Sequence, residues 1–235
     1  ATVVRMWMGF AERFKPAHSP ERPTLSGLKT QMGAMFSLLL AGGLLTWIWV
    51  TDAVGDTAFN LIGQLYPIYL QEIGGLNVEQ IGLLNSTFGV ATILASFASG
   101  WLVDRWNERS VIAGGFLLEA AGLGVMIFAK GFLFFGMSMA IFGFGVGCLM
   151  PAYNSLISKA VPEDKRGLAF GLFGTSLGIL GLPMPWLGAQ MWERIAPQAP
   201  FWVTVVACLI SIPIAWYKFI LPKIKPPLET DAPVA

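Results

Sequence analysis

Long apolar runs, separated by short polar stretches, occupy most of the chain. A window of about 20 apolar residues is long enough to cross a bilayer as a helix. Such windows run from Met35 to Tyr69, Ile81 to Leu102, Val111 to Ala129, Gly131 to Leu156, Gly167 to Trp192 and Phe201 to Phe219. The pattern predicts an all-α, polytopic membrane domain of six transmembrane helices over residues 31–221.

The first window is too long for a single straight crossing. Thirty-five helical residues would extend about 52 Å at 1.5 Å per residue, whereas the hydrocarbon core is about 30 Å thick. Because no polar loop divides this window, we predict one crossing that tilts, protrudes or breaks. Helix-breaking residues mark where the break is expected: Gly55, Gly63 and Pro67.

Composition agrees with a membrane protein and excludes an ordinary soluble domain. The chain is 55% hydrophobic and only 12% charged, about half the usual charged fraction of a soluble protein. A formal net charge of +1 gives no reason to expect a nucleic-acid partner. The polar, basic residues 1–30 are predicted to be a cytoplasmic lead-in, and the Pro-rich residues 222–235 a cytoplasmic tail.

The basic residues predict the orientation of the helices. If the six windows alternate in direction, only Lys130 and Arg194 fall on the side opposite to the termini. Cytoplasmic loops carry the excess of Lys and Arg, so both termini and the loop around residues 104–109 are expected in the cytoplasm. We therefore predict an integral protein of the plasma (inner) membrane, surrounded by lipid.

Carboxyl groups inside apolar spans are expensive and usually functional. Asp52 and Asp56 lie in the first window and Glu119 lies in the third. Asp52, Asp56, Asn60 and Gln64 recur every four residues and so share one helical face, which we predict to line a water-filled cavity. There a carboxyl group could bind a proton on one side of the membrane and release it on the other.

Plainer explanations stay open for these acidic residues. The extra length of the first window could place Asp52, or both aspartates, near the cytoplasmic surface as solvated acids. Glu119 could hydrogen-bond to a neighbouring helix.

The fourth and fifth windows add small residues and two further polar candidates. In GFGVGCLMPAYNS, Gly143 and Gly147 form a small-xxx-small pair that favours close helix packing. Tyr153 and Asn154 follow; they are cavity-lining candidates, with helix packing as the alternative. The fifth window carries a glycine stripe predicted to pack closely, Gly167, Gly171, Gly174, Gly178 and Gly181, and is broken by Pro183 and Pro185.

The loop GWLVDRWNER, between the second and third windows, resembles the signature G-x-L-x-D-R-x-G-R-R of the major facilitator superfamily. Gly100, Leu102, Asp104, Arg105 and Arg109 match it. Asn107 replaces a glycine, and Asn is among the residues most able to adopt a left-handed turn. Glu108 replaces a basic residue, which weakens the positive pattern.

A second segment, VPEDKRGLAFG, is similar to the family's P-x-x-x-R-G-x-A-x-G and contains Arg166. The resemblance implies that Gly100, Asp104, Arg105, Arg109 and Arg166 form a cytoplasmic gating loop. In this reading Gly100 permits close helix approach and Asp104 accepts hydrogen bonds from the arginines or faces a helix N-terminus. The alternative is that the loop only turns the chain and sets its topology.

Family members usually contain two six-helix halves, and this chain resembles the C-terminal one, with residues 1–30 similar to the central loop. The implied partner is an N-terminal half, missing or separate, or a second copy. The implied function is secondary transport of a small solute by alternating access, with proton coupling through the carboxyl groups. Export of a drug or metabolite is favoured because basic residues are scarce inside the spans. A non-transporting membrane interaction protein is the alternative.

Enzymatic and metal chemistry find no motif in the sequence. Cys148 and Cys208 are isolated in apolar spans, without a neighbouring His, and are interpreted as small core residues. No cofactor, metal site or nucleophile-base pair is predicted.

Overall fold

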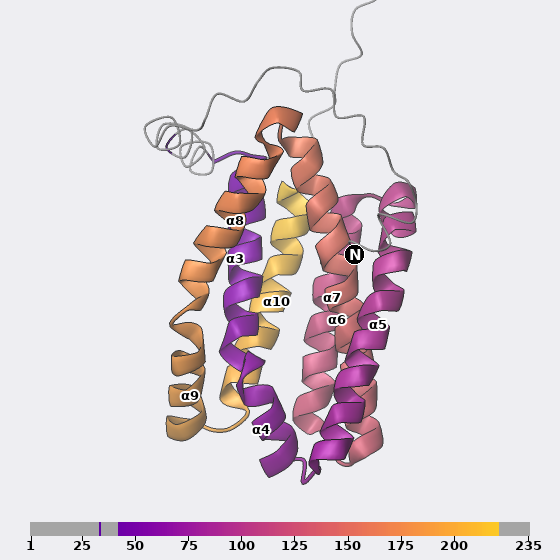
Figure 1. Ribbon diagram of the computed structural model, residues 1–235, viewed down its shortest axis with the longest axis vertical. Coiled ribbons are helices and arrows are strands. Elements are labelled where there is room, and N and C mark those ends of the chain that lie inside the picture. The colour runs from indigo at the N-terminus through magenta and orange to yellow at the C-terminus, as the bar shows by residue number, and fades with distance from the viewer. Residues whose placement is uncertain (1–32, 34–41, 221–235) are drawn as a thin grey trace, which may run out of the picture.

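The computed structural model describes Gly33 and residues 42–220, and every element in residues 42–220 is helical (Figure 1). The predicted lead-in (1–30) and tail (222–235) lie outside the described residues, and these domain boundaries stay predictions. In chain order the elements are α3 (Leu44–Gly63), α4 (Leu65–Glu72), α5 (Val78–Arg105), α6 (Glu108–Phe128), α7 (Phe132–Ala160), the 3-10 turn η1 (Glu163–Lys165), α8 (Arg166–Gly181), α9 (Met184–Arg194) and α10 (Ala199–Lys218).

The helices form an elongated bundle, and five stretches of the described chain are long and apolar enough to cross a membrane. These are α5, α6, α7, the segment Arg166–Arg194 that contains α8 and α9, and α10. The remaining predicted crossing corresponds to α3 with α4. Helix α3 is not among the five, since it carries two aspartates, yet it runs beside α8 and α10 through the bundle (Figure 1). The all-α membrane fold is confirmed.

Both predicted helix breaks are present. Helix α3 ends at Gly63, and α4 starts at Leu65 after the single residue Gln64, so the long first window is divided where Gly63 and Pro67 indicate. Gly55 does not break the helix; it lies inside α3. In the fifth window α8 ends at Gly181 and α9 starts after Pro183, because Pro cannot continue the helical hydrogen bonding.

Helix α7 packs against α5 and α6 at unusually close range. A Cβ atom at Gly147 would collide with the Thr92 carbonyl oxygen of α5, and one at Gly143 would lie 2.7 Å from the Phe88 carbonyl oxygen. The same contact is stabilised by the Ser99 hydroxyl, which donates to the Cys148 carbonyl at 2.9 Å. The predicted small-xxx-small packing is thus confirmed, and it brings two backbones together in the way lipid-embedded helices require.

Helix α10 connects α6 with α3, and α8 and α9 pack on the other side of α3. The Thr204 hydroxyl of α10 donates to the Ala58 carbonyl of α3 at 3.0 Å. On the opposite side, the Trp49 indole N–H donates to the Ser176 hydroxyl of α8 at 2.8 Å. Helix α3 therefore lies between α8 and α10 and is hydrogen-bonded to each of them.

The glycine stripe of α8 does not make the predicted close contacts. A Cβ atom at Gly167, Gly171, Gly174 or Gly178 would meet nothing within 4 Å, and only Gly181 is close to another helix, where a Cβ would lie 3.0 Å from the Asn60 amide nitrogen. Most of the stripe thus has open space beside it within the described chain, and Gly174 lines a cavity between the helices.

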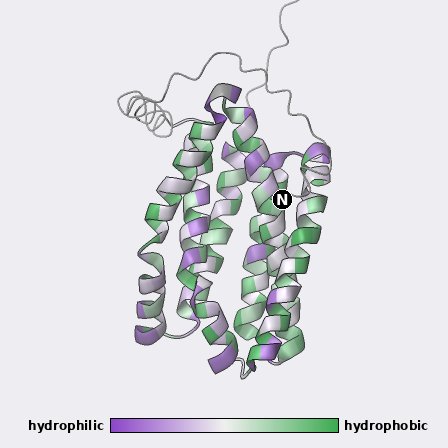
Figure 2. Cartoon of the chain, in the orientation of Figure 1, coloured by the Kyte–Doolittle hydropathy of each residue, from purple (hydrophilic) through white to green (hydrophobic). Residues whose placement is uncertain are grey.

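Hydrophilic residues, purple in Figure 2, gather at the two ends of the bundle and along α3. The end that holds η1, at the top of Figure 1, carries most of the described basic residues, and the end that holds α4 carries Lys130 and Arg194. This separation agrees with the alternation assumed from the sequence. Which end faces the cytoplasm stays a prediction.

Candidate functional site

A cavity of about 390 Å³ lies between α3, α6, α7, α8 and α10, in the half of the bundle nearer to η1. We call it the acidic cavity, because its walls include the carboxyl groups of Asp52, Asp56 and Glu119. Its other walls are mostly apolar and aromatic. The structure therefore brings together all three acidic residues that the sequence predicted for transport.

Two of the carboxyl groups come from α3 and one from α6. Asp52 and Asp56 are one helical turn apart, which places both on the same face of α3, and each is half-buried. Glu119 faces them from α6, where the absence of a side chain at Gly145 leaves room for it: a Cβ there would lie 2.8 Å from the Glu119 Cγ. The Glu119 carboxylate accepts a hydrogen bond from the Cys208 thiol at 3.5 Å.

None of these three carboxyl groups forms an ion pair with a described residue. The ion pairs in residues 42–220 join Lys159 to Glu108 and Arg166 to Glu163, and no Lys or Arg lines the acidic cavity. A charged carboxylate in an apolar surrounding is costly without a cationic partner. The cavity thus has the chemistry to bind a proton or a cationic group.

Tyr153 and Asn154, the polar candidates of the fourth window, also line the acidic cavity. The Tyr153 ring packs edge-on against Phe116, with ring centroids 6.4 Å apart, and against Phe219 at 6.1 Å. Its hydroxyl is buried and has no hydrogen-bond partner among the described residues. Asn154 is exposed at the cavity wall. An unpaired buried hydroxyl is available to a ligand or a water molecule.

Asn60 and Gln64, which the sequence placed on the same face as Asp52 and Asp56, do not line the acidic cavity. The Asn60 side-chain amide donates to the Asp56 carbonyl oxygen at 2.8 Å and to the Asp56 carboxylate at 3.1 Å. Gln64 is the exposed residue between α3 and α4. The face that carries Asp52 and Asp56 turns away from the cavity as α3 approaches its break, since a four-residue interval drifts around a 3.6-residue helix.

Sequence reasoning missed two polar residues of this site. Thr204 and Cys208 of α10 line the acidic cavity one turn apart. The sequence contained a weak signal for them, because both are small polar groups on one face of an apolar helix, but the same pattern is typical of helix packing. The thiol had been interpreted as a core residue, and it is indeed only 2% exposed.

The loop between α5 and α6 holds the residues predicted to form a gating loop, and that role stays a prediction. Gly100 and Asp104 are exposed on α5, and a Cβ at Gly100 would meet nothing within 4 Å, so close helix approach within the described chain does not explain that glycine. The two arginines contact tryptophans: Arg105 lies 5.2 Å from the Trp101 ring centroid and Arg109 lies 5.3 Å from that of Trp216. The Arg109 contact joins the loop to α10, whereas the Arg105 contact lies within α5.

Two ion pairs also lie at the η1 end of the bundle, Arg166 with Glu163 and Lys159 with Glu108. Arg166 lies 3.3 Å from Glu163, and its Nε donates to the Ser158 carbonyl at 2.9 Å, which fastens the start of α8 to the end of α7. Glu108, the departure from the family pattern, is 5% exposed and accepts hydrogen bonds from Lys159 and from the Ser155 hydroxyl. Glu108 therefore connects α6 to α7, a role that the sequence motif did not predict.

Comparisons with known proteins agree with this architecture. The sequence model of the Major Facilitator Superfamily matches residues 48–234. The multidrug resistance protein MdtG of Yersinia enterocolitica is 26% identical over 193 residues, which are 78% of this chain and 45% of that protein. An uncharacterized MFS-type transporter of Methanocaldococcus jannaschii is 24% identical over 169 residues, 70% of this chain and 43% of the relative.

A solved structure shares the fold. The crystal structure of an auto-inhibited POT family peptide transporter superposes with a TM-score of 0.61 at 15% identity, covering 78% of this chain and 39% of that one. The chain thus spans less than half the length of the proteins it matches. With a family model that covers residues 48–234 and a helical bundle of the same fold, the chain belongs to the Major Facilitator Superfamily, a family of membrane transporters and not of enzymes.

Proposed function

We propose that this chain is one half of a secondary active transporter that exports drug-like compounds or metabolites in exchange for protons. The observation that carries the proposal is the acidic cavity, which Asp52, Asp56 and Glu119 all line and which has no Lys or Arg among its described lining residues. Family membership supports transport, and the printed name of the MdtG relatives supports export of drugs.

Proton coupling follows from the chemistry of these carboxyl groups. A carboxylate between apolar helices is stabilised either by a proton or by a bound cation. A substrate that binds near Asp52 and Asp56 would therefore compete with protons, and release of the substrate would accompany proton uptake. This competition is the exchange that an antiporter needs, provided that the cavity opens to each side of the membrane in turn.

The cavity walls favour a neutral or cationic amphipathic substrate. Carboxyl groups attract cations and repel anions, whereas Phe116, Phe170 and Phe173 offer aromatic and apolar contacts. If the η1 end is cytoplasmic, as the distribution of basic residues predicts, the cavity lies nearer to the cytoplasm, where an exporter collects its substrate.

A second six-helix unit is part of the proposal. The chain spans 45% of MdtG and 39% of the peptide transporter, and a pathway enclosed by two units needs the second one. The unused glycines on the outer faces of α5 and α8, Gly100 and Gly171 among them, have the open space that close approach of another helix would fill. The second unit is either the other half or a second copy.

Transport of ethidium into inside-out vesicles of the native membrane tests this function, with and without an imposed pH gradient. We expect gradient-dependent uptake. Asp52→Asn, Asp56→Asn or Glu119→Gln is expected to lower the initial rate roughly tenfold, equivalent to about 1.4 kcal/mol, since the amide cannot exchange a proton. Glu72→Gln is the matched control, because Glu72 is exposed on α4 and does not line the cavity.

Two outcomes would contradict the proposal at different levels. Equal uptake with and without the gradient would remove proton coupling but leave transport. Uptake no greater than in vesicles that lack the chain, for ethidium and for a panel of neutral aromatic drugs, would favour a membrane interaction protein that keeps the fold without turnover.

A further inference from the structure

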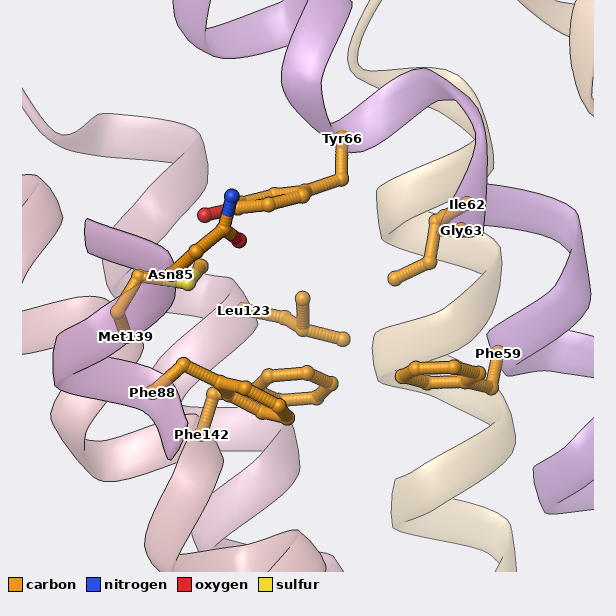
Figure 3. Close-up of a pocket in the computed structure, with 9 residues that line it drawn as sticks. All are labelled: Phe59, Ile62, Gly63, Tyr66, Asn85, Phe88, Leu123, Met139 and Phe142. Atoms are coloured by element: carbon orange, nitrogen blue, oxygen red, sulfur yellow. The ribbon is translucent and has the colours of Figure 1, made fainter. Parts of the chain in front are cut away.

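A second, smaller cavity lies in the half of the bundle nearer to α4, and Figure 3 shows the side chains that line it. Its volume is about 170 Å³, and α3, α4, α5, α6 and α7 all contribute to its walls. We call it the aromatic pocket, because Phe59, Phe88 and Phe142 form one wall.

The three phenylalanine rings stand between the two cavities. Phe59 and Phe142 line both, and their rings stack with centroids 6.2 Å apart and planes 10° apart. Phe88 extends the stack, with its centroid 5.7 Å from that of Phe142. The aromatic pocket therefore shares a flat aromatic wall with the acidic cavity and is otherwise separate from it.

The break between α3 and α4 shapes the opposite wall. Because α3 ends at Gly63 and α4 starts at Leu65, Tyr66 projects over the pocket from the new helix (Figure 3). Gly63 lines the pocket, and a Cβ atom there would meet nothing within 4 Å. The absence of a side chain at this position thus leaves the pocket open.

One polar group in the pocket has no partner. The Tyr66 hydroxyl is buried without a hydrogen bond; among the described residues only this oxygen and that of Tyr153 are in this state. Figure 3 shows the Tyr66 ring extending across the pocket, with its hydroxyl on the same side as the Asn85 amide. Buried polar groups without partners are rare in native proteins and call for an explanation.

We infer that the aromatic pocket is a ligand subsite for an uncharged, planar aromatic group that carries a hydrogen-bond acceptor. The acceptor would accept a hydrogen bond from the Tyr66 hydroxyl, and the ring would stack on the phenylalanines. Among the described residues no Asp, Glu, Lys or Arg lines the pocket, so a charged group is disfavoured. A cavity of roughly 150 Å³ binds benzene in another protein, so the aromatic pocket matches the size of a single ring or of two fused rings.

This inference deepens the proposed transport function and rests on it for its biological meaning. The pocket would hold the aromatic end of a substrate whose cationic or polar end lies among the carboxyl groups of the acidic cavity. Binding is nevertheless measurable without turnover, so the two proposals can fail separately.

Quinoline is a suitable probe, since it is planar, bicyclic and uncharged at neutral pH, with one acceptor nitrogen. Ligand-observed NMR titration of the full chain in nanodiscs, with empty nanodiscs as the blank, gives the Kd. Tyr66→Phe is expected to raise the Kd about fivefold, the usual effect of one lost neutral hydrogen bond. Gly63→Leu is expected to abolish binding, because its side chain would fill the pocket.

The controls separate this site from general effects on the protein. Gly124→Leu adds the same side chain at a glycine with open space that lines neither cavity, and Tyr217→Phe removes the hydroxyl of an exposed tyrosine of α10. Both should bind quinoline as the unmodified chain does. Naphthalene, which has the shape of quinoline but no acceptor, should bind equally to Tyr66→Phe and to the unmodified chain.

Three results would overturn the inference. They are no saturable quinoline binding, binding that Gly63→Leu leaves unchanged, or a Kd that responds to Tyr153→Phe and not to Tyr66→Phe, which would place quinoline in the acidic cavity. A lack of ethidium flux in the unmodified chain would contradict the transport proposal and leave these binding results standing.

Discussion

Asn107, at the turn between α5 and α6, has a φ of 147°, and it is the one non-glycine residue with positive φ in the described chain. Its side chain also caps α6, accepting from the Ser110 backbone N–H at 3.0 Å and from the Ser110 hydroxyl at 2.8 Å. With a ψ of 162°, this backbone lies in a region that glycine adopts far more readily than other residues, and the asparagine side chain adds a capping group. The position where the family signature has glycine thus keeps a glycine-type backbone conformation although its residue is Asn.

Substitutions at Asn107 should separate the two roles. Asn107→Ala loses the cap and keeps a Cβ in the same unfavourable backbone region, so we expect it to lower the free energy of unfolding by about 1 kcal/mol. Asn107→Gly loses the cap but relieves the backbone and should cost only about 0.5 kcal/mol. SDS titration in mixed micelles measures both, and equal costs would contradict the backbone argument.

The Glu108–Lys159 ion pair is asymmetric in burial. The Glu108 side chain is 6% exposed, whereas that of Lys159 is 53% exposed. Lys159→Met leaves a buried carboxylate with only Ser155 as a side-chain partner and should cost about 2 kcal/mol. Glu108→Gln leaves an ammonium group that water can solvate and should cost less than about 1 kcal/mol. The same denaturation assay applies, and the reverse order of the two costs would show that burial does not govern this pair.

At the scale of helices, the same residue type has opposite consequences at different positions. Gly143 and Gly147 of α7 lie against the α5 backbone, whereas Gly174 and Gly178 of α8 have open space around them. The sequence shows both pairs as glycines in apolar helices. Only the packing of the helices shows which glycines are needed for a close contact within this chain and which are not.

Leucine scanning of these glycines gives a direct measurement. Gly147→Leu should destabilise the chain by more than about 3 kcal/mol or prevent folding, because the new Cβ would collide with the Thr92 carbonyl oxygen and neither backbone can move freely. Gly178→Leu should leave the denaturation midpoint of the isolated chain unchanged. Comparable destabilisation by both variants would contradict the observed packing.

The predicted breaks and the carboxyl-bearing face were visible at this scale without a structure. Gly63 marks the end of α3 and Pro183 the start of α9, because the backbone conformation and hydrogen bonding of these residues are determined locally. Gln64 was placed by the sequence on the face of Asp52, yet it lies exposed between two helices. A local periodicity ends where the helix ends, and the residue at the break no longer follows it.

For the whole molecule, the distribution of basic residues predicts how the bundle sits in the membrane. Cysteine labelling tests it with Arg105→Cys, Arg166→Cys and Lys130→Cys. The native thiols of Cys148 and Cys208 are 7% and 2% exposed and should react slowly. A membrane-impermeant maleimide should label the first two variants only from the cytoplasmic side and Lys130→Cys only from the other side. Labelling of Arg105→Cys and Arg166→Cys from opposite sides would contradict the topology.

Composition and pattern alone determined the class of this protein. Apolar windows of helical length fixed the α-helical membrane bundle, because in lipid the backbone must satisfy its own hydrogen bonds. The rarity of carboxyl groups inside those windows was enough to select Asp52, Asp56 and Glu119 as candidates, since a charge in hydrocarbon persists only where it has a role.

Only the tertiary structure decided which of these residues meet. Glu119 lies far from Asp52 and Asp56 in the sequence, and the packing of α10 against both α6 and α3 brings it to the same cavity. Three other features likewise depend on neighbours from other helices. They are the aromatic wall of Phe59 and Phe142, the unpaired Tyr66 hydroxyl and the contact of Arg109 with Trp216. Local pattern encodes what each helix prefers, but contacts between helices depend on how their shapes fit together.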